Sequence, residues 1–337
     1  MKVLITGGAG FIGSHLADRC LREGWPVHVL DDLSTGSIEN LFDAIQDGAN
    51  LGVASVLEAG VVDALVAQCD VVFHLAATVG VGLVMDSPLK TIETNVQGTE
   101  VVLRAAAKHG KRVVVASTSE VYGKSDKIPF REDGDLTLGP TSKGRWSYAC
   151  SKMLDEFLGL AYYHEEKVPV TVVRLFNTVG PRQSRHYGMV LPNFVHQALV
   201  GSPIIVHGSG SQRRCFGYIL DVVEALIRIV KTDATIGEVI NVGNDQEIDI
   251  GGLAYMVRER LRSCSDIVYV PYSAIYGPGF EDMMRRVPSL VKLERLIGYR
   301  PNTPLEVIVD AVAEEIRGKV DAETLKTRPI AASLRDS

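Results

Sequence analysis

The sequence lacks an excess of basic residues and any long hydrophobic run, and each absence argues against a class of protein. Its 337 residues include 35 Lys and Arg against 41 Asp and Glu, which gives a formal net charge of −6. A nucleic-acid-binding protein normally carries a basic surface. No apolar run approaches the roughly 18 residues of a membrane span, and the N-terminal MKVLITGGAG has no apolar core of a secretory signal. We therefore expect a soluble protein that binds neither nucleic acid nor membranes.

Cysteine is also scarce. The five cysteines stand at positions 20, 69, 150, 215 and 264, an odd number without a CxxC pair. Disulfide frameworks and structural zinc sites both need paired or closely spaced cysteines. We therefore expect a reducing, cytoplasmic environment and no metal site. The length and the 46% hydrophobic content fit one large or two closely packed globular domains.

The first half of the chain alternates short β-branched runs with amphipathic stretches. Strands that are buried on both faces of a parallel sheet have continuous apolar runs, and helices cover them. The order therefore predicts an α/β fold with a Rossmann-type, doubly wound parallel sheet. The predicted strands are residues 2–6, 27–30, 71–76, 112–117 and 170–176, and the predicted helices lie near 11–23, 58–68, 88–109 and 147–164.

The second half has more Gly and Pro loops and shorter elements. Helical patterns recur near 190–200, 221–231, 250–261 and 304–316, and one more buried strand candidate is 238–243. This pattern indicates a smaller mixed α/β domain that closes over a ligand. We predict a Rossmann domain at 1–176 and 217–248, a substrate domain at 177–216 and 249–320, and a flexible tail at 326–337.

A glycine-rich turn joins the first predicted strand to the first helix. Thr6 to Gly13 read TGGAGFIG. In this context Gly7 allows the tight turn, Gly10 lets the backbone approach a pyrophosphate, and Gly13 lets helix and strand pack closely. Asp31 follows the second strand about 20 residues later, where an acid binds the adenosine ribose hydroxyls and repels a 2′-phosphate. The pattern predicts NAD rather than NADP as the cofactor.

Tyr148 and Lys152 lie four residues apart in a helical pattern, so they share one face of the helix. A nearby ammonium favours the phenolate, so we expect Lys152 to lower the pKa of Tyr148 and make it a general base. Thr118 ends a predicted sheet strand, which is where catalytic groups of open α/β sheets lie. The three residues together predict hydride-transfer chemistry at a hydroxyl-bearing carbon.

Seven features, in this order and at these distances, resemble the extended short-chain dehydrogenase/reductase family. The resemblance spans nearly the whole chain and implies a Rossmann domain with tightly bound NAD and a C-terminal domain that binds a nucleotide sugar. It also implies a homodimer formed through the helices near 88–109 and 147–164. The features are TGGAGFIG, Asp31, FHLAA (73–77), ETNVQGT (93–99), STSEVYG (117–123), YACSK (148–152) and RLFNTVGPR (174–182).

The resemblance assigns roles to individual residues. By position the family's catalytic tetrad falls on Asn95, Thr118, Tyr148 and Lys152. Asn95 would order a helix and a water, and Thr118 would bind the sugar hydroxyl. Tyr148 would be the acid and base, and Lys152 would hold the nicotinamide ribose. The implied NAD-binding residues are Gly7, Gly10, Phe11, Ile12, Gly13, Asp31, Leu75, Ala76, Tyr148 and Lys152.

Within the family, the triplet Thr118-Ser119-Glu120 is similar to the UDP-glucuronate decarboxylases. GRWSYACSKMLDEF (144–157), GSGSQRRCF (208–216) and the segment at Arg286 are similar to that group as well. The resemblance implies that Glu120 and Arg286 contact the C6 carboxylate or the leaving CO2. Oxidation at C4 would make a β-keto acid that loses CO2, so we expect UDP-glucuronate to be converted to UDP-xylose or its 4-keto form.

Two alternatives stay open. GPRQSRHYGMVLPNF (180–194) and GFEDMMRRVP (279–288) also resemble 4-epimerases of UDP-glucuronate or UDP-glucose, which use the same cofactor and tetrad. A non-catalytic NAD-binding scaffold is the distant alternative, because fold does not fix function. The predicted substrate-binding residues are Thr118, Ser119, Glu120 and Arg286, with Asn177 and Arg214 on the diphosphate, Arg182, Arg185 and His186 as alternative carboxylate ligands, and His207 in place of the aromatic residue that stacks on uracil.

Overall fold

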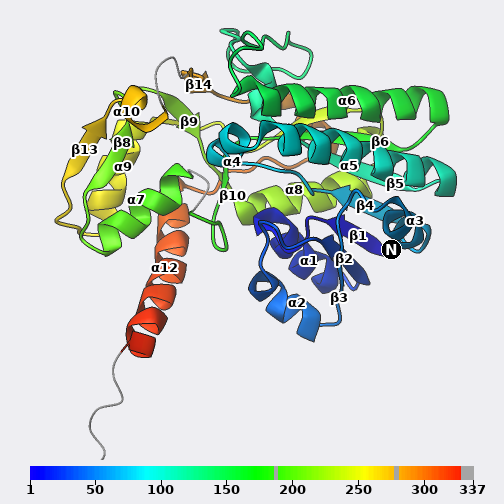
Figure 1. The fold of residues 1–337 in the computed structure, drawn as a ribbon, viewed down its shortest axis with the longest axis horizontal. Helices are drawn as coiled ribbons and strands as arrows, with labels where there is room; N and C mark the ends of the chain where they lie inside the picture. Colours follow the sequence, from blue (N-terminus) through cyan, green and yellow to red (C-terminus); the bar gives the residue numbers. More distant parts are fainter. Residues whose placement is uncertain (186–188, 277–280, 328–337) are drawn as a thin grey trace, which may run out of the picture.

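The computed structural model describes residues 1–185, 189–276 and 281–327, and a seven-stranded parallel sheet lies at its centre (Figure 1). The strand order reverses between β1 and β4, which is the position where ligands bind in doubly wound sheets. This confirms the predicted fold class. In spatial order the strands are β11 (Val239–Val242), β6 (Val170–Leu175), β5 (Arg112–Thr118), β4 (Val71–His74), β1 (Val3–Thr6), β2 (Val27–Asp31) and β3 (Asn50–Val53).

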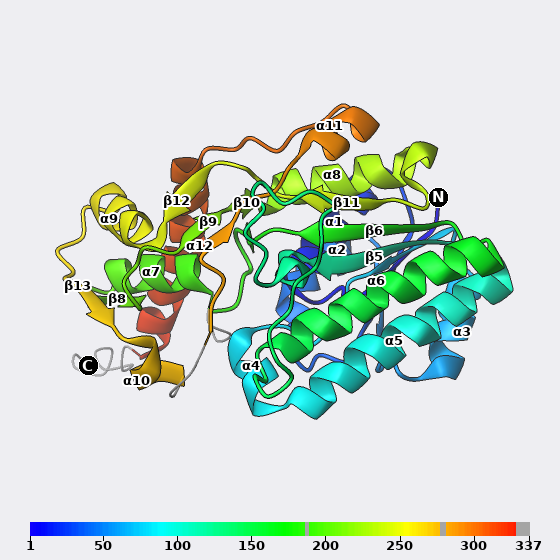
Figure 2. The same ribbon diagram turned by 90° about the horizontal axis from the view of Figure 1, so that it is seen from above.

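Helices cover both faces of this sheet, as Figure 2 shows. Successive side chains of a strand point to opposite faces, so Val3 and Ile5 of β1 join one hydrophobic core while Leu4 joins the other. The first core includes α1 (Phe11–Arg22) and α8 (Ile219–Lys231), and the second includes α3 (Ala59–Ala67) and α5 (Pro88–His109). The long helix α6 (Trp146–Glu166) packs beside α5.

The edge strand β3 falls outside the predicted runs. Its four residues, NLGV, are partly or fully exposed. An edge strand with little burial does not need the continuous β-branched run of a central strand, and the sequence therefore gives a weak signal there.

The second region is built from three small sheets around its own core. One of them pairs β9 in antiparallel with β12 and in parallel with β14, which fits the predicted mixed α/β architecture. The sheets are β7 (Thr178–Val179) with β10 (Gly217–Tyr218), β8 (Ile204–His207) with β13 (Ile267–Val270), and β9 (Arg213–Cys215) with β12 (Glu247–Asp249) and β14 (Arg285–Arg286). Its helices are α7 (Val190–Leu199), α9 (Ile250–Arg260), α10 (Tyr272–Tyr276) and α12 (Leu305–Thr327).

Two segments show how the regions are joined along the chain. Strand β11 returns to the large sheet beside β6. Helix α11 (Val291–Ile297) lies within 249–320, yet Leu293 belongs to the core of the large sheet. Helix α12 continues to Thr327, so the first two residues of the expected tail are helical, and the rest of that tail lies outside the described residues. None of the described helices is both long enough and apolar enough to cross a membrane.

Candidate active site

A cavity of about 950 Å³ opens at the carboxyl ends of β1, β2, β4 and β5 and extends to the second region. Of the described residues predicted for the site, all but Asn95 line this cavity. His186 lies outside the described residues. The lining includes Gly7, Gly10, Phe11, Ile12, Gly13, Asp31, Leu75, Ala76, Thr118, Ser119, Glu120, Tyr148, Lys152, Asn177, Arg182, Arg185, His207, Arg214 and Arg286.

The glycine-rich turn is closely packed against the segment that follows β4. Gly7 has φ +71°, and a Cβ there would lie 2.7 Å from the backbone N of Ala76. A Cβ at Gly13 would lie 2.3 Å from the carbonyl oxygen of Gly7. Helix α1 begins after Gly10 without a side-chain cap. Its first N–H groups are therefore free to bind an anion, as a dinucleotide site requires.

Asp31 lies at the end of β2 and lines the same end of the cavity. Its Oδ2 accepts a hydrogen bond from Ala9 N at 2.9 Å, and its Oδ1 accepts one from Leu33 N at 2.8 Å. Burial raises the pKa of Asp31, although these two N–H donors favour the carboxylate. The acid therefore ties the glycine-rich turn to β2 in addition to facing the cavity.

Tyr148 and Lys152 face the cavity from the first two turns of α6, beside Thr118 at the end of β5. The expectation that Tyr148 has a lowered pKa is wrong for this structure. Burial raises its pKa, the charge of Glu120 raises it further, and a hydrogen bond with Thr118 only partly offsets them. The Nζ atom of Lys152 lies 2.6 Å from Oδ2 of Asp155, so a carboxylate offsets part of the ammonium charge.

Asn95 lies behind this face, on α5, and is fully buried. Its Oδ1 accepts a hydrogen bond from Thr78 N at 2.9 Å, and its Nδ2 donates to Oγ of Ser151 at 3.0 Å. These contacts connect α5, α6 and the loop after β4. The predicted helix-ordering role of Asn95 is compatible with this placement.

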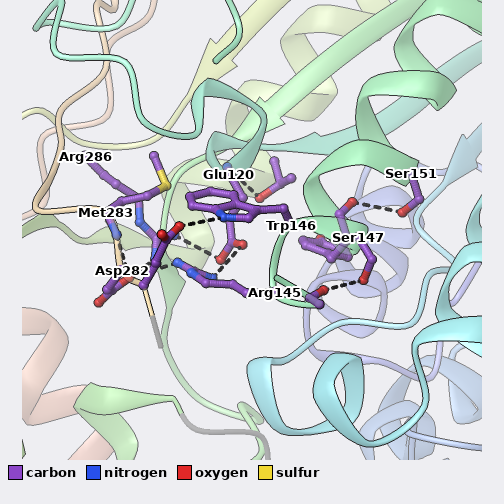
Figure 3. A network of polar contacts seen from close by, with 12 residues as sticks. Glu120, Arg145, Trp146, Ser147, Ser151, Asp282, Met283 and Arg286 are labelled. Atoms are coloured by element: carbon purple, nitrogen blue, oxygen red, sulfur yellow. Dashed lines mark hydrogen bonds and ion pairs between the residues drawn. The ribbon is translucent and has the colours of Figure 1, made fainter. Parts of the chain in front are cut away.

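Glu120 is held between two guanidinium groups on the cavity wall (Figure 3). Its Oε1 lies 3.3 Å from Nη1 of Arg286, and its Oε2 lies 3.2 Å from Nη1 of Arg145. Arg145 also donates to Oδ1 of Asp282 at 2.8 Å. Both carboxylate oxygens of Glu120 therefore have a guanidinium partner, which fixes the side chain on the cavity wall.

Asp282 connects this wall to the predicted diphosphate site. Its Oδ2 accepts hydrogen bonds from Nη2 of Arg214 and from the hydroxyl of Tyr272, both at 2.9 Å. Burial would raise the pKa of Asp282, but Arg214, Arg286 and Arg145 together hold it below its usual value. Burial and the charge of Arg286 lower the pKa of Arg214 to about 10. Three guanidinium groups thus share two carboxylates, which leaves one positive charge in excess.

Sequence reasoning missed Arg145, Asp282 and Tyr272. Arg145 lies three residues before Tyr148 in a stretch already compared with the decarboxylases, so its position was the available signal. Asp282 likewise lies in GFEDMMRRVP (279–288), a stretch already compared with the 4-epimerases, whereas Tyr272 lies in no stretch that was compared with a relative.

The remaining predicted substrate residues lie at different parts of the cavity. Arg182 pairs with Asp18 of α1 at 2.8 Å, which places it toward the glycine-rich turn. Asn177 donates from Nδ2 to the carbonyl of Cys215 at 2.9 Å. The ring of His207 lies 5.7 Å from that of Tyr276 in an edge-on arrangement. Tyr276 also lines the cavity, so an aromatic ring is present beside His207 after all.

Residues 3–243 match the NAD dependent epimerase/dehydratase family. The chain belongs to this family. NAD is its cofactor, in agreement with Asp31 and the glycine-rich turn. Among curated members of the epimerase/dehydratase family, a UDP-N-acetyl-alpha-D-glucosaminuronate decarboxylase of Bacillus cytotoxicus is 43% identical over 306 residues, covering 90% of this chain and 94% of that protein. UDP-glucuronic acid decarboxylase 1 of Danio rerio is 36% identical, covering 90% of this chain and 70% of that protein.

Solved structures of family members have the same fold. The UDP-glucuronic acid 4-epimerase of Bacillus cereus, in complex with UDP-glucuronic acid and NAD, superposes with a TM-score of 0.83 at 27% identity, covering 95% of this chain and all of that one. The UDP-glucose 4-epimerase of Thermotoga maritima superposes with a TM-score of 0.86, also at 27% identity and over 95% of this chain and all of that one. Proteins named for both of the reactions that the sequence left open are therefore similar to this chain.

Proposed function

We propose that this protein is an NAD-dependent decarboxylase of a UDP-hexuronate, with UDP-glucuronate as the first substrate to test. The observation that carries the proposal is the charge on the cavity wall near Tyr148. Among the described residues, Arg145, Arg214 and Arg286 form ion pairs with Glu120 and Asp282, and these three positive charges exceed the two negative ones by one, which favours an anionic group. The decarboxylase relatives, which match over 90% of this chain, support the same assignment.

The chemistry follows from oxidation at C4 of the sugar. NAD supplies the chemistry of accepting a hydride from C4 and returning it later. Tyr148, beside Thr118, would take the C4 hydroxyl proton during oxidation, which leaves a ketone at C4. The C5–C6 bond would then break, CO2 would leave, and its bonding electrons would form an enolate with the C4 oxygen. Protonation of the enolate and reduction at C4 would complete the conversion to the pentose.

Other residues of the chain would bind and orient the sugar nucleotide. Arg286 would hold the C6 carboxylate near Glu120, while Arg214 and Asn177 would bind the diphosphate. Lys152 would hold the nicotinamide ribose, and Asp31 the adenosine ribose. A buried cavity wall excludes water, which strengthens the charge interactions that act on a departing carboxylate.

A 4-epimerase is the second candidate. The specific observation in its favour is the similarity of this chain to the solved UDP-glucuronic acid 4-epimerase. The superposition covers all of that epimerase chain. The same guanidinium groups could hold the carboxylate while the 4-keto sugar rotates in the site. C4 would then receive the hydride on its opposite face. A non-catalytic scaffold has less support, because Thr118, Tyr148 and Lys152 are assembled around one cavity.

We also propose a homodimer in the cytoplasm. Helices α5 and α6 lie side by side and expose Leu89, Ile92, Leu154 and Phe157, with Leu89 68% and Phe157 64% exposed. Packing these two helices against those of a second copy would bury this surface in a four-helix bundle. All five cysteines are free, which suits a reducing compartment.

Incubation with UDP-glucuronate or UDP-N-acetylglucosaminuronate, each with NAD, tests the proposed reaction. Mass spectrometry of the product should show loss of CO2 from one of the two substrates. A product of unchanged mass but altered C4 configuration would instead establish the epimerase. No conversion of either sugar, with intact NAD binding, would leave the scaffold as the better account.

A further inference from the structure

A buried carboxylate lies next to the active-site lysine and has no part in the chemistry proposed above. Oδ2 of Asp155 lies 2.6 Å from Nζ of Lys152, nearly one turn further along α6. The side chains of Asp155 and Lys152 are 0% and 3% exposed. A carboxylate is almost never buried so completely unless it is paired. Burial raises the pKa of Asp155, while Lys152 favours its charged form.

A chain of hydrogen bonds supports Asp155 from behind. A hydrogen bond from the Thr99 hydroxyl favours the carboxylate form of Asp155, so Thr99 donates its proton to Asp155. Thr99 Oγ1 then accepts from Nε2 of His74 at 3.0 Å, and Nδ1 of His74 accepts from the Thr6 hydroxyl at 2.8 Å. Thr6 Oγ1 in turn accepts from Ala76 N at 3.3 Å. This series of hydrogen bonds connects the glycine-rich turn to Lys152. Each hydroxyl and ring nitrogen in it can donate and accept in the directions that its neighbours require.

His74 contributes to this chain as a neutral group. Its ring is completely buried, and burial together with the smaller effect of the Lys152 charge lowers its pKa to about 3. At neutral pH the imidazole therefore donates at one nitrogen and accepts at the other, as the chain requires. Asp155 is the one member of the chain with a charge to offset that of the lysine.

Asp155 also acts on Tyr148. Besides burial, Glu120 and Asp155 raise the pKa of Tyr148, whereas the Thr118 hydrogen bond and the charge of Arg286 lower it. Seven residues of helix separate Tyr148 from Asp155, which is about 10 Å along the axis. Lys152 lies between them in sequence on the same helix. The carboxylate thus fixes the ammonium, and its negative charge also acts on the phenol.

We propose that Asp155 is a positioning residue of the active site. Its carboxylate holds the Lys152 ammonium on the face of α6 that carries Tyr148 and offsets part of the ammonium charge at the phenol. The proposal rests on the proposed function only for oxidation at C4, which a decarboxylase and a 4-epimerase share. It assigns to this carboxylate a role in setting the pH at which Tyr148 can accept a proton.

Asp155→Asn tests the proposal because it removes the charge and keeps the shape. At an effective dielectric constant near 20, a unit charge about 10 Å from a phenol shifts its pKa by about one unit. Losing the negative charge lowers the pKa of Tyr148, so more phenolate is present at low pH. The rate of NADH formation is measured against pH with NAD and UDP-glucuronate. We expect the acidic limb of this pH–rate profile to move to lower pH by about one unit.

Glu156→Gln is the matched control. Glu156 is the next residue of the same helix and is also buried, but it pairs with Arg174 at 2.7 Å and with Ser117. Its loss should lower the melting temperature and leave the acid limb in place. Thr99→Val provides a second test, should Asp155→Asn fail to fold. It removes the hydroxyl that favours the Asp155 carboxylate, so it should move the limb in the same direction by a smaller amount.

A second measurement reads the phenol directly. Ultraviolet difference titration of the NAD-loaded enzyme against Tyr148→Phe reports phenolate formation without turnover, and the Asp155→Asn curve should again lie at lower pH. The contrary result is that Asp155→Asn leaves both the acidic limb and the titration curve at the pH of the parent and lowers only the plateau rate. Asp155 would then be a structural residue. If the parent forms NADH with neither UDP-glucuronate nor UDP-N-acetylglucosaminuronate, the proposed function fails, and the titration still decides the role of Asp155.

Discussion

Replacing Glu120 with Gln separates the two chemical steps of the proposed reaction. Glu120 is 14% exposed in its side chain and bonds Arg145 at 3.2 Å and Arg286 at 3.3 Å. Gln keeps the size and one acceptor oxygen but removes the negative charge. The excess positive charge of the cavity wall then rises from one to two, which stabilises a bound substrate carboxylate before it leaves as neutral CO2.

The size of this effect follows from Coulomb's law. A carboxylate bound by the same guanidinium groups would lie roughly 6 Å from Glu120, where a unit charge at an effective dielectric constant near 20 is worth about 3 kcal/mol. Extra stabilisation of the reactant carboxylate by this amount slows CO2 release roughly 100-fold. Oxidation at C4 leaves the carboxylate charge unchanged, and loss of the Glu120 charge lowers the pKa of Tyr148, so we expect oxidation not to slow.

The assay follows both steps in one reaction. Rapid mixing with UDP-glucuronate reports oxidation through the rise in NADH absorbance, and a substrate labelled at C6 reports release of CO2. Glu281→Gln is the control, because Glu281 adjoins Asp282 and bonds Trp146 at 3.0 Å and Lys124 at 2.7 Å. Equal slowing of both steps in Glu120→Gln would refute the electrostatic argument and leave Glu120 an orienting residue.

Three further predictions concern the cofactor site and the buried histidine. Tyr148→Phe should lower turnover by about 10²–10⁴-fold with NAD still bound, and turnover within about threefold of the parent would contradict its acid–base role. Asp31→Ala should weaken NAD binding, measured by calorimetry, and reduce the preference for NAD over NADP. Unchanged affinities for both cofactors would show that Asp31 only connects the glycine-rich turn to β2. His74 has a pKa of about 3 when folded and an ordinary value of 6.5. Between these two pH values the unfolded chain therefore binds one proton more than the folded chain. As the pH falls through this range, His74 lowers the free energy of unfolding by up to about 1.4 kcal/mol per pH unit. Denaturant titrations should show this slope in the parent and lose it in His74→Gln, whereas an identical slope in both would assign it to other groups.

The strands of the large sheet and the glycine-rich turn could be predicted because their signals are local. A strand buried on both faces needs a continuous apolar run, and β1, β4 and β5 each have one. Gly13 is required by contacts within the turn itself, and Gly7 by the positive φ of that turn, although the close approach of Ala76 to Gly7 comes only with the folded sheet. The helical spacing of Tyr148 and Lys152 likewise placed both on one face.

The sequence by itself thus determined the fold class, NAD as the cofactor and the helix face that carries both Tyr148 and Lys152. Only the tertiary structure decided the charge around that pair. Arg145 and Asp282 lie 137 residues apart and meet at 2.8 Å, and no local pattern records such a contact. The raised pKa of Tyr148 is likewise a sum over burial and charges from several elements. Electrostatic energies depend on distance and solvent exclusion, and both are set only when the chain has folded.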